Sequence, residues 1–383
     1  MLQTTKGATG LSDLDSKSNT MDIKPRKVLL ILALLLVIVG AVLMVVYRDS
    51  IGIALSSGGR SGGDRKPFTY SSASKIEADA MGNGLAIVSN NGMELLDSGG
   101  RLAMKEVVAM KNPAVVASSS RAAAFDIGTN NIVVGDLHGN SKSLDLEEDI
   151  ITATMNDDGW LAVCTEAKGY HGKVTVYNMA QQEVYRWSSG EGYLVTAHVS
   201  PDHRYLATLC VTTGGGVVHI MKLDNKNEVA QFKEENVLIT DLHWLEDDRI
   251  FLLEREKCTV IGRDGRAVGS FEFGDKVVTN FAYGEDFAAL MLCDYISGKN
   301  GGLVTIGPEC SVLGQTNVTT GLQAMDANRG SVALLCGDGV YLYTKSLSQA
   351  GKAEGDAGVL DVVLRSNADT FLITQNTALI RNF

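Results

Sequence analysis

Eight stretches of similar pattern recur after residue 77, and this repetition constrains the fold more than any other feature of the sequence. Each stretch has a short apolar segment, a turn of Asp, Asn or Gly, a second segment rich in Leu, Ala and Val, and a third apolar segment. The stretches begin 36 to 44 residues apart, a length that suits three or four strands joined by turns. They span residues 78–97, 115–137, 151–178, 195–223, 239–265, 278–307, 322–344 and 359–383.

Helical periodicity is nearly absent from these stretches, so we predict an all-β fold of consecutive antiparallel sheets around an axis. Eight units predict a single eight-bladed β-propeller over residues 67–383, with a seven-bladed ring as the alternative. The last unit has only three strands, and a strand at Pro67–Ser72 precedes the first unit without a sheet of its own. We expect these two segments to pair and close the ring, because closure leaves no sheet edge exposed.

An uncharged apolar run before the repeats predicts one transmembrane helix at residues 28–47. Nineteen such residues, Val28 to Val46, would form a helix about 28 Å long, which matches the hydrocarbon core of a bilayer. Residues 1–27 are then a polar tail, and residues 48–66 are a flexible linker rich in Gly and Ser. Met21 is an alternative start of the chain.

The charges beside this run predict its orientation in the membrane. Lys24, Arg26 and Lys27 precede it, whereas Arg48 at its end is balanced by Asp49. Positive charge favours the cytoplasmic side, so we expect a single-pass protein of the cell membrane with a cytoplasmic amino terminus and an extracytoplasmic propeller. Cleavage of the run as a signal peptide is the alternative, but nineteen apolar residues exceed the usual signal-peptide core.

The charge of the large domain argues against two classes of partner. After residue 66 the chain carries 25 basic and 40 acidic residues. Binding to nucleic acid or to an anionic lipid surface needs Lys and Arg to neutralise phosphates, so we expect neither. The spanning helix remains the predicted contact with the membrane.

The six cysteines show neither the Cys-x-x-Cys nor the Cys/His spacing of a zinc or redox site. Four of them, Cys164, Cys210, Cys293 and Cys336, each close a similar apolar run of their unit. We therefore interpret these four as buried small hydrophobic residues rather than halves of disulfides.

No spacing typical of a nucleophile elbow, a phosphate-binding loop, a zinc protease or an EF-hand occurs, and we predict no catalytic residue and no cofactor. The histidines are spread over several units. His198 and His243 stand two and three residues after Thr196 and Thr240, so we expect them to point to opposite faces of their strands. We predict no metal site, because such a site needs at least three converging ligands.

Four successive units begin with a β-branched apolar residue followed by a threonine: Ile151-Thr152, Val195-Thr196, Ile239-Thr240 and Val278-Thr279. The first strand of a propeller blade lines the central channel, so these hydroxyls form an arc that could hold water or a small polar ligand. The alternative is structural: threonine is a favoured strand residue, and its hydroxyl can cap the entrance of a strand.

The segment VTAHVSPDHRYLATL at 195–209 resembles the strand, Ser-Pro-Asp turn and strand of WD-repeat and TolB-like propellers. The other units are degenerate and lack the Gly-His and Trp-Asp signatures of true WD repeats. As a whole, the chain is similar to uncharacterised membrane-anchored propeller proteins of Gram-positive bacteria. That resemblance implies a domain of unknown function and carries no assigned activity.

These observations favour a membrane-tethered, extracytoplasmic propeller that acts as a non-enzymatic binding or scaffold module of the cell envelope, with a protein or other envelope component as its partner. The alternative is a hydrolase or lyase with an active site at the propeller axis. Three or more His, Asp or Glu side chains converging on the axis would favour the enzyme.

Overall fold

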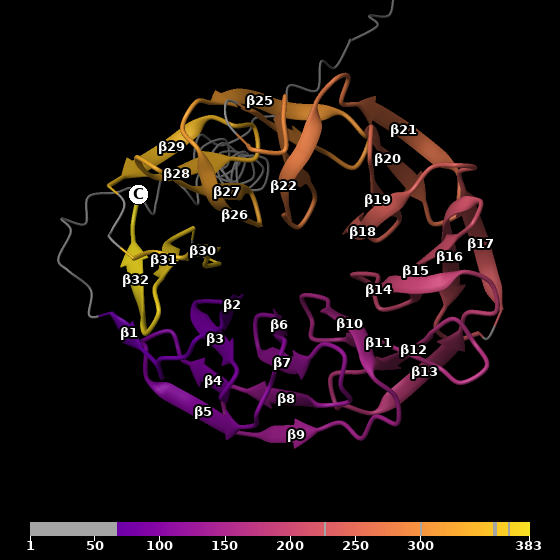
Figure 1. Ribbon diagram of the computed structural model, residues 1–383, viewed down its shortest axis with the longest axis horizontal. Coiled ribbons are helices and arrows are strands. Elements are labelled where there is room, and N and C mark those ends of the chain that lie inside the picture. The colour runs from indigo at the N-terminus through magenta and orange to yellow at the C-terminus, as the bar shows by residue number, and fades with distance from the viewer. Residues whose placement is uncertain (1–66, 226, 299–300, 355–357, 367) are drawn as a thin grey trace, which may run out of the picture. The chain divides into compact units, whose positions relative to one another are not determined.

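A computed structural model describes residues 67–383, apart from residues 226, 299–300, 355–357 and 367. In this part of the chain, eight four-stranded antiparallel sheets stand side by side in a ring (Figure 1). Each sheet is one blade, and blades 1 to 8 are numbered from the sheet that contains β2 (Ile76–Met81). The prediction of an eight-bladed all-β propeller is confirmed.

The first strand of each blade lies nearest the axis, and the strands follow outward in chain order, except for the outermost strand of blade 8 (Figure 1). The inner strands are β2, β6 (Pro113–Ala117), β10 (Ile150–Met155), β14 (Tyr193–Val199), β18 (Ile239–Glu246), β22 (Val277–Tyr283), β26 (Leu322–Asn328) and β30 (Asp361–Leu364). The second strands are β3 (Gly84–Ser89), β7 (Arg121–Asp126), β11 (Leu161–Thr165), β15 (Tyr205–Thr212), β19 (Arg249–Glu254), β23 (Ala288–Cys293), β27 (Ser331–Cys336) and β31 (Thr370–Ile373).

The third and fourth strands complete the blades toward the rim. The third strands are β4 (Gly92–Leu96), β8 (Ile132–Asp136), β12 (Lys173–Tyr177), β16 (Gly215–Lys222), β20 (Lys257–Gly262), β24 (Gly301–Ile306), β28 (Gly339–Thr344) and β32 (Thr377–Arg381). The fourth strands are β5 (Leu102–Val107), β9 (Ser141–Ser143), β13 (Glu183–Ser188), β17 (Glu228–Lys233), β21 (Ala267–Glu272), β25 (Val312–Val318), β29 (Gln349–Ala353) and, in blade 8, β1 (Phe68–Thr69).

Burial explains why the second strands read as continuous apolar runs. Every residue of β11, β23 and β27 is buried, because both faces of the strand pack against neighbouring blades. At the rim, β17 and β21 instead alternate exposed and half-buried residues. The apolar cores therefore lie between successive blades, so each blade depends on its neighbours for burial.

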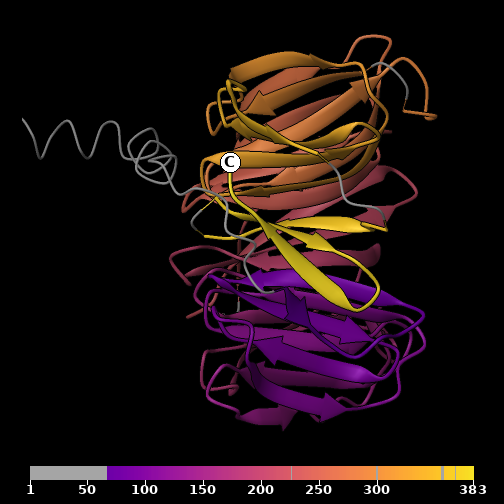
Figure 2. The same ribbon diagram turned by 90° about the vertical axis from the view of Figure 1, so that its left-hand side faces the viewer.

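The ring closes through β1, which pairs with β32 in the register Phe68↔Ala378. The phenyl ring of Phe68 lies 5.1 Å from that of Phe371, centroid to centroid, and both are buried. The Tyr70 hydroxyl lies 2.7 Å from the carbonyl oxygen of Thr374, to which it donates a hydrogen bond. Seen from the edge of the ring, the yellow strands of blade 8 lie beside the indigo strands of blade 1 (Figure 2). The first described strand thus completes the last sheet, as the sequence predicts.

Cys164, Cys210, Cys293 and Cys336 are free and buried, as their apolar surroundings predict. The predicted tail, spanning helix and linker at residues 1–27, 28–47 and 48–66 lie outside the described residues. Within the described part, no helix is long and apolar enough to cross a membrane.

Candidate functional site

A chamber lies on the axis of the ring, at the end where the first strand of each blade turns into the second. Its volume is about 530 Å³, and all eight blades contribute to its wall. Its polar lining consists of Asp79, Ser118, Ser119, Thr154, Asn156, Asp157, Asp158, His198, His243, Trp244, Tyr283, Glu285, Asp326, Asn328, Arg329 and Ser366. A concave site of this size suits a small polar ligand or a few side chains of a partner.

Five of these side chains stand at the same level of their inner strands. The strand ladders pair Asp79, Thr154, His198, His243 and Asp326 with Ala86, Ala162, Ala207, Phe251 and Ala333 on the second strands. The chamber floor is therefore a ring of carboxylates, imidazoles and a hydroxyl from five blades.

The two floor aspartates each join neighbouring blades. Asp79 accepts hydrogen bonds of 2.7 Å from the N–H of Ala80 in its own strand and from that of Ala117 in blade 2. Asp326 accepts one of 2.8 Å from Ala327 and one of 2.7 Å from Leu364 in blade 8. Burial raises the pKa of both Asp79 and Asp326 to about 7, although these N–H groups favour the charged form.

An aromatic cluster occupies the opposite side of the floor. The ring centroids of His198 and His243 are 5.6 Å apart in an edge-to-face arrangement, and His243 stacks on Tyr283 at 4.3 Å. The Tyr283 hydroxyl donates a hydrogen bond of 2.9 Å to Asp241. Burial lowers the pKa of His198 to about 3 and that of His243 to about 4, so both imidazoles are neutral at pH 7.

The prediction that His198 and His243 point to opposite faces is wrong. The ladder of β14 skips a residue between Leu194 and Thr196, whereas that of β18 skips one between Ile239 and Asp241. Thr196 of β14 therefore corresponds to Asp241 of β18. His198 stands two residues after Thr196 and His243 two residues after Asp241, so the two histidines point to the same face of their strands. Across residues 67–383, with the gaps named above, no group of three or more His, Cys, Asp or Glu side chains is arranged to hold a metal ion.

The four threonines of the predicted arc do not occupy equivalent positions, because the skipped residue of the inner strand falls at a different place in different blades. Thr152 and Thr196 pair with the second strand directly after the skipped residue, whereas Thr240 and Thr279 are the skipped residues of their own strands. The Thr240 hydroxyl lies 3.1 Å from the carbonyl oxygen of Leu253, to which it donates. None of the four lines the chamber. A ligand role for them stays a prediction.

The mouth of the chamber carries exposed charged groups. Asp157, Asp158, Glu285 and Arg329 are all exposed. The Arg329 guanidinium lies 3.8 Å from Glu285, and Asp158 lies 2.8 Å from the imidazole of His203. Such exposed pairs contribute little to stability, which leaves these side chains available to a partner.

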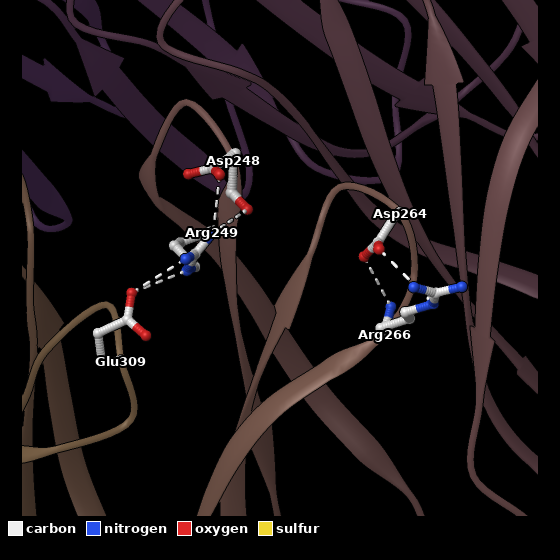
Figure 3. A network of polar contacts seen from close by, with 5 residues as sticks. All are labelled: Asp248, Arg249, Asp264, Arg266 and Glu309. Carbon is white, nitrogen blue, oxygen red and sulfur yellow. Dashed lines mark hydrogen bonds and ion pairs between the residues drawn. The ribbon is translucent and has the colours of Figure 1, made fainter.

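Further out on the same end, a polar network joins blades 5 and 6 (Figure 3). Arg249 lies 2.7 Å from Asp248 beside it and 3.0 Å from Glu309 of blade 6. Asp264 and Arg266 form a longer pair of 3.7 Å within blade 5. The turns on this end therefore carry many charges of both signs around the chamber mouth.

A profile described as "Family of unknown function (DUF5711)" matches residues 65–380, which is most of the chain. The chain belongs to this family. No curated protein matches it. The family match and the confirmed propeller fold agree with the predicted resemblance to uncharacterised propeller proteins.

Two solved structures share the fold of this DUF5711 member. One is the C-terminal WD40 domain of Sif2, with 11% identity and a TM-score of 0.58, covering 83% of this chain and 99% of that one. The other is the β-propeller domain of Cps50 (Swd1) from Myceliophteria thermophila, with 11% identity and a TM-score of 0.51, covering 73% and 99%. At this identity the likeness shows a WD40-like propeller and nothing of its ligand.

Proposed function

We propose that this DUF5711 member is a membrane-tethered, extracytoplasmic propeller that binds an envelope partner at the chamber mouth without catalysing a reaction. The chamber carries the proposal, because every blade contributes to one concave site whose mouth bears exposed charged side chains. The apolar run at 28–47 and the flanking Lys24, Arg26 and Lys27 support the anchor and its orientation.

The bonding of the titratable groups in the chamber favours binding over catalysis. Both carboxylates of the floor accept backbone hydrogen bonds that hold adjacent blades together, and Asp241 is engaged by Tyr283. These contacts give Asp79, Asp326 and Asp241 structural roles. The floor is therefore held in place by hydrogen bonds between blades, and the exposed charged side chains at the mouth are the groups that would contact a partner.

Capture from cross-linked membranes tests the proposal. The full chain carrying Asp157→Asn and Glu285→Gln at the mouth should capture its partner several-fold less than the wild type. The matched control is Glu166→Gln with Glu191→Gln, two exposed carboxylates at the other ends of the strands in blade 3. Equal capture by all three proteins would show that the chamber mouth is not the binding site.

The orientation has its own test. Protease added to intact cells or protoplasts should digest the propeller and spare residues 1–27. Protection of the propeller would reverse the proposed topology.

A hydrolase or lyase is the second candidate, and one observation favours it. The floor brings two carboxylates with a pKa of about 7 to the same level as two imidazoles, and groups that titrate near neutrality suit acid/base catalysis. Turnover of chromogenic ester, phosphate or glycoside substrates that is lost with His243→Gln would support the enzyme.

A further inference from the structure

Two cysteines from neighbouring blades meet outside the chamber. Cys258 lies on β20 of blade 5 and is buried, whereas Cys310 lies in the turn between β24 and β25 of blade 6 and is half-buried. The sulfur of Cys310 is 4.0 Å from the carbonyl oxygen of Cys258, although 52 residues separate the two in the chain. Both side chains belong to the same apolar core.

Blades 6 and 7 have two leucines at the positions equivalent to Cys258 and Cys310. The ladders make Leu303 of blade 6 equivalent to Cys258, and the turn in blade 7 makes Leu347 equivalent to Cys310. Leu303 and Leu347 are both buried in one core, so the position brings two side chains of adjacent blades together. Apolar packing alone is satisfied there by two leucines, and blades 5 and 6 have two thiols instead.

The backbone around Cys310 accommodates the cysteine at a cost. Cys310 has a φ of 56°, and the equivalent turn positions of three other blades hold Gly100, Gly139 and Gly265, also with positive φ. Gly269 of blade 5 leaves room for it, since a Cβ there would come within 3.0 Å of the Cys310 Cβ. Blade 5 is therefore shaped to receive this side chain.

The two thiols also interact with each other. The hydrogen bond between them is the first cause that lowers the pKa of Cys310 and the first that raises the pKa of Cys258. The thiols of Cys210 and Cys293 instead contact the hydroxyls of Ser189 and Thr279. The half-buried Cys310 is the group that ionises first, and it is the one that a reagent can reach.

We propose that Cys258 and Cys310 are a redox pair that a small-molecule disulfide oxidises to a disulfide bond between blades 5 and 6. The Cys310 thiolate attacks the reagent disulfide, which forms a mixed disulfide and releases one reagent thiolate. The Cys258 thiolate then attacks the Cys310 sulfur and releases the second. The protein loses two electrons and two thiol protons, and the reagent becomes two thiols. The bond would link blades 5 and 6 covalently and close a loop of 52 residues in the unfolded chain, which stabilises the folded state.

Oxidised glutathione tests the pair on the full chain in detergent at pH 8. Digestion with trypsin and a protease that cleaves before aspartate separates Cys310 from Cys336, and mass spectrometry should then find one linked peptide pair joining Cys258 and Cys310. The oxidised protein should melt several degrees higher than the reduced one. Cys310→Ser should remove both the link and the shift.

Cys164 and Cys210 provide the matched control, because they too share a core between adjacent blades and should stay unlinked. The Cys258→Ser variant should stop the reaction at a mixed disulfide of Cys310 with glutathione. A wild-type protein that also stops at this mixed disulfide, or that stays fully reduced while folded, would overturn the proposal. The result does not depend on whether the chamber binds a partner.

Discussion

The Asp326 carboxylate on β26 accepts a hydrogen bond of 2.7 Å from the N–H of Leu364 on β30, so an ionisable side chain joins blade 7 to blade 8. Asp79 makes the same contact from blade 1 to Ala117 of blade 2. Both carboxylates are half-buried and line the chamber on the axis. Two of the joints in the ring therefore include a group whose pKa lies near neutrality.

These aspartates predict a component of stability that falls as pH rises. Their pKa is about 7 in the folded protein against 3.8 as the model value for an unperturbed aspartate, so between these values the folded state binds more protons than the unfolded state. Stability from this source is complete below pH 3.8 and is lost as pH rises through 7, at up to about 1.4 kcal/mol per pH unit for each group.

Urea denaturation of Asp79→Asn with Asp326→Asn should reveal this component. The free energy of unfolding of the variant, relative to wild type, should improve steadily from pH 4 to pH 8. Asp97→Asn is the control, because hydrogen bonds from Arg101 and Gly99 lower the pKa of Asp97 below 3.8. Its contribution is lost only as pH falls below this value, so the difference between this control and wild type should stay constant from pH 4 to pH 8. A difference between the double variant and wild type that does not change with pH would contradict the assignment.

The floor histidines predict the opposite dependence. Their pKa values of about 3 and 4 lie below the 6.5 of an unperturbed imidazole, so the unfolded state binds more protons in between. Stability from this source is complete above pH 6.5 and is lost as pH falls toward 3. The variant His198→Gln with His243→Gln should therefore lose less stability than wild type between pH 6.5 and pH 4 in urea denaturation. An unchanged acid limb of the curve would contradict neutral, buried imidazoles.

The four core cysteines should resist alkylation in the folded protein. Cys164, Cys210, Cys293 and Cys336 are at most 4% exposed, so iodoacetamide should label them only after denaturation and without prior reduction. Cys310, which is half-buried, should react first in the native protein and provides the internal comparison. Mass spectrometry that finds two of the four linked would contradict their assignment as free, buried thiols.

The fold could be predicted from the sequence because each strand and turn has a recognisable pattern of its own residues. Apolar runs such as LAVC and LATLC mark strands buried on both faces, and turn residues separate them at a regular spacing, so blades could be counted without any knowledge of their contacts. The unpaired strand before the first unit likewise predicts closure.

The chamber could not be predicted in the same way, because a single skipped residue decides which side chains face it. Thr196 and Thr240 look equivalent in the sequence, yet the bulges make Thr196 correspond to Asp241. Asp79 and Asp326 show one usable signal, because in the inner strands of two different units an aspartate stands between two apolar residues. Their partners Ala117 and Leu364 are backbone groups of the next blade, which leave no trace in side-chain patterns.

Ring closure gives the last prediction, because the whole propeller depends on one two-residue strand. Phe68 is 3% exposed and packs on Phe371, which is fully buried, and Tyr70 adds hydrogen bonds to Thr374 and Thr377. Truncation of a buried phenylalanine costs about 3–5 kcal/mol, a large share of a typical domain stability of about 5–15 kcal/mol.

We therefore expect Phe68→Ala to lower the melting temperature sharply and deletion of Pro67–Ser72 to lower it further, with aggregation through the exposed edge of β32. Phe281→Ala is the matched control, since Phe281 is 43% exposed and its loss should have a small effect. Deletion of residues 56–63 should leave the melting temperature nearly unchanged. Thermal unfolding followed by circular dichroism compares the four variants with the wild type, and equal melting temperatures would mean that β1 does not hold the ring closed.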